Sequence, residues 1–144
     1  MSLAKFREAI HHAFAETEEA VELTLTLMSF GFKKGIPLDA DFVYDVRMLP
    51  NPFYIDELKP LTGNDIAVRN YVMKFPESQE YYAKLRALIE FQIPLCRKEG
   101  RRQLVIAIGC TGGQHRSVTF ANLLNGDFTD MGYKVNCKHR EIGQ

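Results

Sequence analysis

Hydrophobic and polar residues follow two different periods along this chain, and the changes of period divide it into strands and helices. In the segment 21–30 (VELTLTLMSF), valine or leucine stands at every second position, with threonines between, which predicts a β-strand. Further strands are predicted at 42–47, 103–108 and 133–140. Apolar residues at helical spacing predict helices over 4–20, 64–74 and 76–98, and a last one from the end of a loop at 109–115 to about 125. This order is that of an α/β fold with an open, mostly parallel sheet flanked by helices.

The first twenty residues differ from the rest of the chain. Phe6, Ile10 and Phe14 share one stripe of the helix predicted there, whereas Glu8 and Glu18 lie off that stripe. We therefore divide the chain into residues 1–20, an amphipathic helix or linker to an upstream domain, and residues 21–144, one α/β domain.

Composition limits the function classes. The 144 residues suffice for one domain with a core of its own. Basic and acidic side chains balance at 18 each, so any nucleic-acid binding must come from a local basic patch. The three cysteines are widely spaced and follow no zinc-binding pattern, and no apolar run is long enough for a membrane span. We expect a cytoplasmic protein without a metal, a cofactor or a membrane contact.

The most specific feature is the loop Gly109–Ser117, which follows the apolar run 104–108 and leads into a helix. Gly112 and Gly113 allow backbone N–H groups to approach a ligand, and the helix directs its positive N-terminal end to the same place. Arg116 adds a planar set of donors that suits a phosphate. The loop therefore predicts an anion-binding site.

Other polar residues are expected beside this loop, because parallel strands end at one edge of a sheet and ligands bind outside that edge. His115 either binds the anion or packs against the last strand, and Asp45 and Arg47 either bind ligand or pair with each other. Thr111 and Ser117 are expected to bind ligand, cap the helix, or do both. The candidate ligand-binding residues are Ser29, Lys33, Asp45, Arg47, Cys110, Thr111, Gly112, Gly113, His115, Arg116, Ser117 and His139.

The loop carries part of the pattern of one enzyme class and lacks the pattern of another. Cys110 to Ser117 fits the C-x5-R-[ST] pattern of cysteine-dependent phosphatases, in which Cys110 would be the nucleophile and Asp45 or Asp56 the acid. Gly109 stands where those phosphatases have histidine. No Gly-Lys-[Ser/Thr] follows the glycines, so the loop lacks the elements that hold a nucleoside triphosphate with magnesium. We therefore expect no ATPase activity from this chain alone, and catalysis only under the phosphatase alternative.

Long motifs in order along the chain resemble the C-terminal domain of the RapZ/YvcJ family. They are SFGFKKGIP at 29–37, DADFVYDVRMLPNP at 39–52, Thr62-Gly63, AIGCTGGQHRSV at 107–118 and His139-Arg140. The resemblance implies a phosphofructokinase-like α/β unit that binds glucosamine 6-phosphate, a phosphorylated amino sugar, as a regulatory sensor. It also implies contact with small RNA in the RNase adapter members, while the family's nucleotide-binding label belongs to an N-terminal domain.

This chain departs from the family pattern at three places. Gln114 stands where the family loop usually has lysine, Phe53 stands where the RapZ proteins have histidine, and the last residues lack the basic cluster of the RNA-binding members. We accordingly expect weak RNA binding, although an RNA-binding adapter module stays an alternative. Lys74 falls where the family carries a basic residue and joins the candidate ligands. The expected partners are a small phosphorylated sugar and an upstream domain, a homo-oligomer or both.

Overall fold

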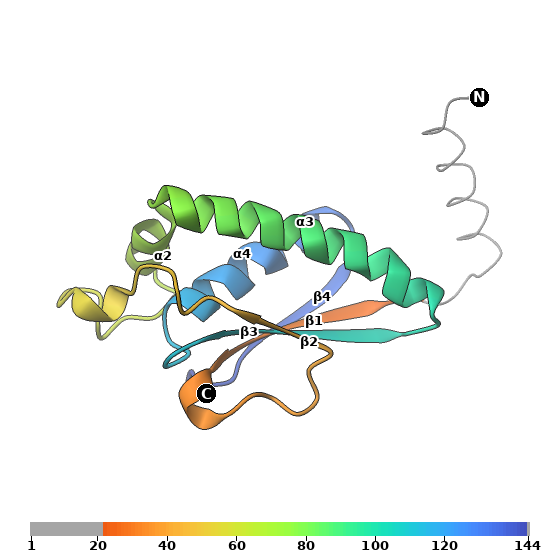
Figure 1. Cartoon of the computed structure of the whole chain (residues 1–144), viewed down its shortest axis with the longest axis horizontal. Coiled ribbons are helices and arrows are strands. Elements are labelled where there is room, and N and C mark those ends of the chain that lie inside the picture. The colour runs from red at the N-terminus through yellow and green to blue at the C-terminus, as the bar shows by residue number, and fades with distance from the viewer. Residues whose placement is uncertain (1–21, 144) are drawn as a thin grey trace.

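A four-stranded parallel sheet forms the framework of the domain, as the computed structural model shows for residues 22–143 (Figure 1). The strands are β1 (Thr24–Gly31), β2 (Phe42–Asp45), β3 (Gln103–Cys110) and β4 (Lys134–His139), arranged in the order β2-β3-β1-β4. Every neighbouring pair is parallel, so the predicted α/β fold with a mostly parallel sheet is confirmed. The helix predicted over 4–20 lies outside the described residues.

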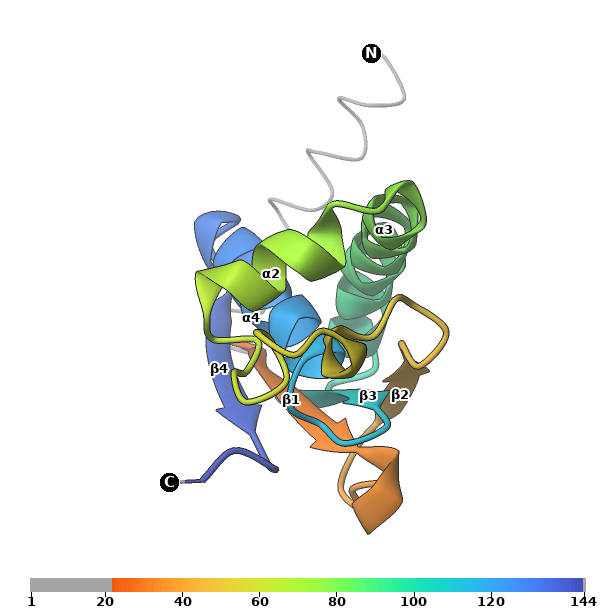
Figure 2. The same cartoon turned by 90° about the vertical axis from the view of Figure 1, so that its left-hand side faces the viewer.

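Three helices lie on one face of this sheet (Figures 1 and 2). They are α2 (Ile66–Met73), α3 (Pro76–Lys98) and α4 (Arg116–Asp130). The core forms between them and the sheet because alternate residues of β1 and β3 point to the helices, including the fully buried Leu25, Leu27, Ile106 and Ile108. Among the residues described, no helix has both the length and the apolar character to cross a membrane.

Helix boundaries agree with the sequence pattern to within two residues except at the end of α4; α2 was predicted over 64–74 and spans Ile66–Met73. The range of α3 is the predicted one, and the helix continues through Pro94, flanked by the buried Ile93 and Cys96. In α4 the prediction ended at about 125, whereas the helix continues to Asp130. It passes through Gly126 because burial of Phe128 stabilises the added turn more than the glycine disfavours it.

The segments that follow β1 and β3 lie side by side at the carboxyl edge of the sheet. Gly31 is in register with Cys110, so the chain that follows β1 runs beside the loop that follows β3. The two backbones approach so closely that a Cβ on Gly31 would lie 2.6 Å from the carbonyl carbon of Gly112. A Cβ on Gly113 would lie 2.6 Å from the backbone nitrogen of Gly31. The glycine pair thus fixes the loop 111–116 to β1, one of the two central strands of the sheet.

Candidate functional site

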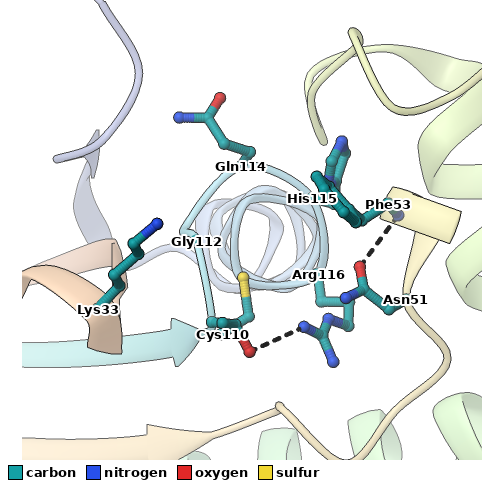
Figure 3. A pocket seen from close by; sticks show the side chains of 9 residues that line it. Lys33, Asn51, Phe53, Cys110, Gly112, Gln114, His115 and Arg116 are labelled. Carbon is teal, nitrogen blue, oxygen red and sulfur yellow. Dashed lines mark hydrogen bonds between the residues drawn. The ribbon is translucent and has the colours of Figure 1, made fainter.

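A pocket of about 210 Å³ lies at this carboxyl edge, in front of the N-terminus of α4 (Figure 3). Its lining residues are Lys33, Asn51, Phe53, Cys110, Thr111, Gly112, Gln114, His115 and Arg116. Six of them were candidate ligands from the sequence, and they come from two separate segments. The pocket is smaller than the roughly 300–1,000 Å³ of sites for drug-sized ligands, so it suits a small molecule.

Arg116, the first residue of α4, is buried at the wall of this pocket with only 3% of its surface exposed. Its Nη1 donates hydrogen bonds to the carbonyl oxygens of Arg47, at 2.5 Å, and Leu49, at 3.0 Å. Its Nη2 lies 3.4 Å from the Thr111 hydroxyl (Figure 3). Across residues 22–143, no carboxylate lies within 4.0 Å of the guanidinium. Asp45 interacts with the Arg116 charge through space but does not contact it, so an anion in the pocket would further offset the cost of burying this cation.

Backbone N–H groups add to this positive character. The carbonyls of Thr111 and Gln114 accept hydrogen bonds from the amides of Lys33 and Gly63. In the described part of the chain, the amides from Gly112 to Arg116 donate to no protein group. They stand at the N-terminus of α4, where the helix dipole favours negative charge. Amides without a protein partner at a helix N-terminus can donate to an oxyanion, but Gly113, whose amide nitrogen lies against Gly31, does not line the pocket.

Two further side chains carry polar groups at the pocket. His115 is 6% exposed, and its Nε2 is buried with no hydrogen-bond partner within residues 22–143. Lys33 follows β1 in the short 3-10 helix η1 (Phe32–Lys34), is exposed, and has no carboxylate within 4.0 Å among the same residues. An unpartnered buried nitrogen and an unpaired ammonium are both available to a bound ligand.

The two loop glycines have different roles. Gly113 has a φ of 76°, and its missing side chain leaves room for the Glu141 side chain. Gly112 is not in the left-handed region, and a Cβ built on it would contact nothing within 4 Å. The backbone therefore needs glycine at 113, whereas Gly112 keeps one wall of the pocket open.

Asp45, Arg47 and Lys74 do not line the pocket. Arg47 donates side-chain hydrogen bonds of 2.8–3.1 Å to both carboxylate oxygens of Asp45, and its guanidinium lies over the Phe32 ring. These hydrogen bonds are the largest cause of a lowered pKa for the Asp45 carboxyl. Lys74 places its ammonium over the rings of Tyr71 and Phe75. Of the two alternatives predicted for Asp45 and Arg47, the structure contains the mutual ion pair.

Ser29 and His139 lie inside the domain, away from the pocket lining. The Ser29 Oγ is 2.7 Å from Nδ1 of His139, whose Nε2 is 2.9 Å from the amide oxygen of Asn122. Because that oxygen only accepts, Nε2 carries the hydrogen and Nδ1 of the neutral ring accepts from Ser29. Burial lowers the pKa of His139. The pair therefore links β1, β4 and α4 through half-buried hydrogen bonds.

The cysteine of the phosphatase pattern is present in the expected neighbourhood, but an acid is not. The Cys110 Sγ lies 3.1 Å from the Ser117 hydroxyl, and both residues are buried. No aspartate or glutamate lines the pocket, and Asp45 is held ionised by Arg47. A thiolate mechanism would need a carboxylic acid to protonate the leaving group, and the pocket does not supply one.

Three lining residues were missed as candidate ligands from the sequence. Asn51 accepts a hydrogen bond from the Phe53 amide and so begins the 3-10 helix η2 (Pro52–Tyr54), which brings both residues to the pocket. Gln114 donates to the carbonyl of Glu141 at 2.6 Å. An Asn-Pro pair is a turn signal and could have marked Asn51, whereas nothing local marks where the 48–63 excursion crosses the loop.

A basic surface for RNA could lie on β4, and in the structure it is small. Arg140 pairs with Glu141 and donates to the carbonyl of Gly35, so it is engaged within the domain. Lys134 and Lys138 are exposed on β4. The strand therefore presents two exposed lysines, neither of which has a carboxylate within 4.0 Å among residues 22–143, rather than a continuous basic face.

Comparisons with known proteins agree with the motifs. The family model of the RapZ C-terminal domain matches residues 23–143. A nucleotide-binding protein of Limosilactobacillus reuteri (strain DSM 20016) is 61% identical over 124 residues, covering 86% of this chain and 43% of that protein. A nucleotide-binding protein of Thermoanaerobacter sp. (strain X514) is 51% identical over 144 residues, covering 100% of this chain and 51% of that protein. The chain spans about half the length of these relatives. On the extent of the family match, the chain belongs to the RapZ C-terminal domain family.

Proposed function

We propose that this domain binds a small phosphorylated sugar of the glucosamine 6-phosphate class, with the phosphate held by the loop 111–116. The single observation that carries the proposal is Arg116, whose buried guanidinium has no carboxylate partner in the part of the chain described. A phosphate dianion would neutralise this charge and occupy its remaining N–H donors.

Other donors and a second positive charge lie beside Arg116 at the same wall of the pocket and would also bind a phosphate. The amides of Gly112 and its neighbours are free to donate, and Lys33 adds a second cation. Hydrogen bonds to a charged group contribute about 1.5–3 kcal/mol each, so a few of them suffice for micromolar binding.

The sugar part fits the rest of the pocket. Asn51 and Gln114 offer amide groups for hydroxyls, and the half-exposed Phe53 ring offers an apolar wall for the C–H face of a pyranose. No carboxylic acid lines the pocket, so the proposed role is binding without turnover. The choice of an amino sugar rests on the family resemblance, and the experiment below compares it with other phosphates.

Thermal-shift and calorimetric titrations of the 144-residue chain test the proposal with glucosamine 6-phosphate, glucosamine, inorganic phosphate and AMP. We expect glucosamine 6-phosphate to stabilise most, inorganic phosphate less and glucosamine not at all, because the phosphate provides the charge contact. A ligand at 100 times its dissociation constant adds about 2.7 kcal/mol of stability. Absence of stabilisation by every phosphate at millimolar concentration would refute the proposal, and preference for AMP would reassign the ligand to the nucleotides.

A further inference from the structure

We propose that Glu141 is a positioning residue for the phosphate site, and that its buried carboxylate holds the loop 111–116 in the shape that binds the anion. This role rests on the proposed function, because it concerns the affinity of the same pocket. The carboxylate belongs to residues 140–142, which follow β4 and which we call the C-terminal strap. Neither Arg140 nor Glu141 lines the pocket, so their effect on a ligand would pass through the loop.

The Glu141 side chain is only 6% exposed, although it carries a charge. Its Oε2 accepts hydrogen bonds from the Gly31 amide, at 3.0 Å, and from Nε of Arg140, at 2.8 Å. Burial alone would raise the pKa of Glu141, but these hydrogen bonds and the Arg140 charge outweigh burial and lower the pKa, so the group is ionised at neutral pH. The carboxylate is therefore a fixed acceptor inside the domain.

Arg140 attaches the strap to β1 and to the segment that follows it. Its Nη2 donates to the carbonyl of Gly35 at 2.7 Å and lies 2.6 Å from Oε2 of Glu141. Its guanidinium lies over the Phe30 ring, 5.5 Å from the ring centre. Its backbone amide donates to the Ser29 carbonyl at 3.0 Å. Main chain and side chain together thus fix the position of the neighbouring Glu141.

Two contacts join Glu141 to the loop. Its carbonyl accepts a 2.6 Å hydrogen bond from Nε2 of Gln114, which orients the side-chain amide that we assign to a sugar hydroxyl. Its Cγ packs against Gly113, where a Cβ would lie only 2.5 Å away. Loss of the carboxylate would free the loop without removing any group that we place against the ligand. A loop that must become ordered during binding binds more weakly than a preorganised one.

Charge alone predicts the opposite effect. Glu141 brings a negative charge close to a site proposed for an anion, so a purely electrostatic role means that its removal strengthens phosphate binding. A positioning role means that its removal weakens phosphate binding. The sign of the change in affinity therefore distinguishes the two roles. Glu141→Gln separates charge from support, because its amide oxygen can still accept a hydrogen bond from the Gly31 amide.

Calorimetric titration of the 144-residue chain with glucosamine 6-phosphate and with inorganic phosphate tests this role. We expect Glu141→Ala to weaken binding at least about tenfold. We expect Glu141→Gln to bind as tightly as the parent chain or more tightly. Glu80→Ala is the matched control and should bind like the parent, because Glu80 is an exposed glutamate that also pairs with a cation, Lys84.

Three results would overturn the role of Glu141. Unchanged or tighter binding by Glu141→Ala would overturn it alone, and so would equal weakening by Glu141→Ala and Glu141→Gln. A parent chain that binds neither phosphate would overturn the proposed function and this role with it. Denaturant unfolding of each variant without ligand shows which of them are folded at the temperature of the titration.

Hydrogen exchange at the Gly31 amide measures closure of the strap in the parent chain, without any substitution. If the closed strap favours binding, bound ligand must favour the closed strap by linkage. Saturating glucosamine 6-phosphate should therefore slow exchange at Gly31 at least about tenfold, as measured by NMR. The control is the Thr24 amide, which donates to the Arg102 carbonyl at the other end of β1. Equal slowing at both amides, or none at Gly31, would contradict a strap that positions the loop.

Discussion

The guanidinium of Arg116 donates a 3.0 Å hydrogen bond to the main-chain carbonyl of Leu49, which joins the first turn of α4 to the segment after β2. Its bond to the Arg47 carbonyl extends the same connection. Nη1 of this side chain therefore holds the pocket wall in place, while Nε has no hydrogen-bond partner among residues 22–143. If the proposed anion binds here, one residue serves both the fold and the binding.

Replacing Arg116 should affect both properties. We expect Arg116→Ala to lose phosphate binding at least tenfold and to lower the free energy of unfolding by about 1–3 kcal/mol, because the buried Leu49 carbonyl and the part-buried Arg47 carbonyl lose their donor. Lys33→Ala is the matched comparison, since Lys33 is exposed and should change affinity alone. Denaturant unfolding and calorimetry on both variants measure the two effects. Unchanged binding in both would show that the anion lies elsewhere.

Substitution by alanine should change the stability of the domain differently at Gly112 and at Gly113. Gly113→Ala forces a φ of 76° on a residue with a Cβ and places that atom 2.5 Å from the Glu141 side chain, so we expect a loss of at least about 1–3 kcal/mol. Gly112→Ala meets no atom within 4 Å and should change stability by less than about 0.5 kcal/mol. Urea unfolding of the two variants checks this, and equal stabilities would contradict the contact between Gly113 and Gly31.

Stability should fall between neutral and mildly acidic pH because of His139. Its pKa is lowered by burial, so the unfolded state binds the proton more readily than the folded state does. The contribution is complete above the unfolded pKa of about 6.5 and is lost as the pH falls through the folded value. We expect His139→Gln to be less stable at pH 7.5 and to show a smaller decrease towards pH 5. If the stability of the parent chain and of His139→Gln decreases equally with falling pH, His139 is not the cause of the decrease.

Substitution of Cys110 distinguishes a phosphate-binding sensor from a phosphatase. We expect no hydrolysis of an aryl phosphate by the parent chain, since its pocket lining includes no carboxylic acid, and nearly unchanged phosphate binding by Cys110→Ser. Turnover assays and calorimetry on the same two proteins provide the measurements. Hydrolysis by the parent that disappears in Cys110→Ser would establish the phosphatase alternative instead.

Local pattern was sufficient to predict the elements of the fold and the centre of the site. The alternation around Leu25 and Leu27 predicted β1, and the glycines before Arg116 predicted the loop that lines the pocket, because both signals are contained in a few adjacent residues. The mostly parallel sheet followed from the order of the elements and is confirmed.

The rest depended on contacts between distant segments. Asp45 and Arg47 are placed at a strand end by the pattern, but only the turn after β2 decides that they bind each other. Asn51 and Phe53 reach the pocket because the 48–63 excursion folds back over the loop, and no periodicity encodes that path. His139 satisfies both ring nitrogens internally, which depends on the register of β4 with β1.

The backbone contact between Gly31 and Gly113 has a consequence for how the domain would respond to damage. With no side chain between the two segments, there is no compressible layer to absorb a small slip of β1 against β3. A core substitution that moves these strands by a fraction of an ångström would therefore be transmitted to the loop amides. Affinity for the proposed anion would then depend on how well β1 and β3 are aligned, and it would decline before the domain unfolds.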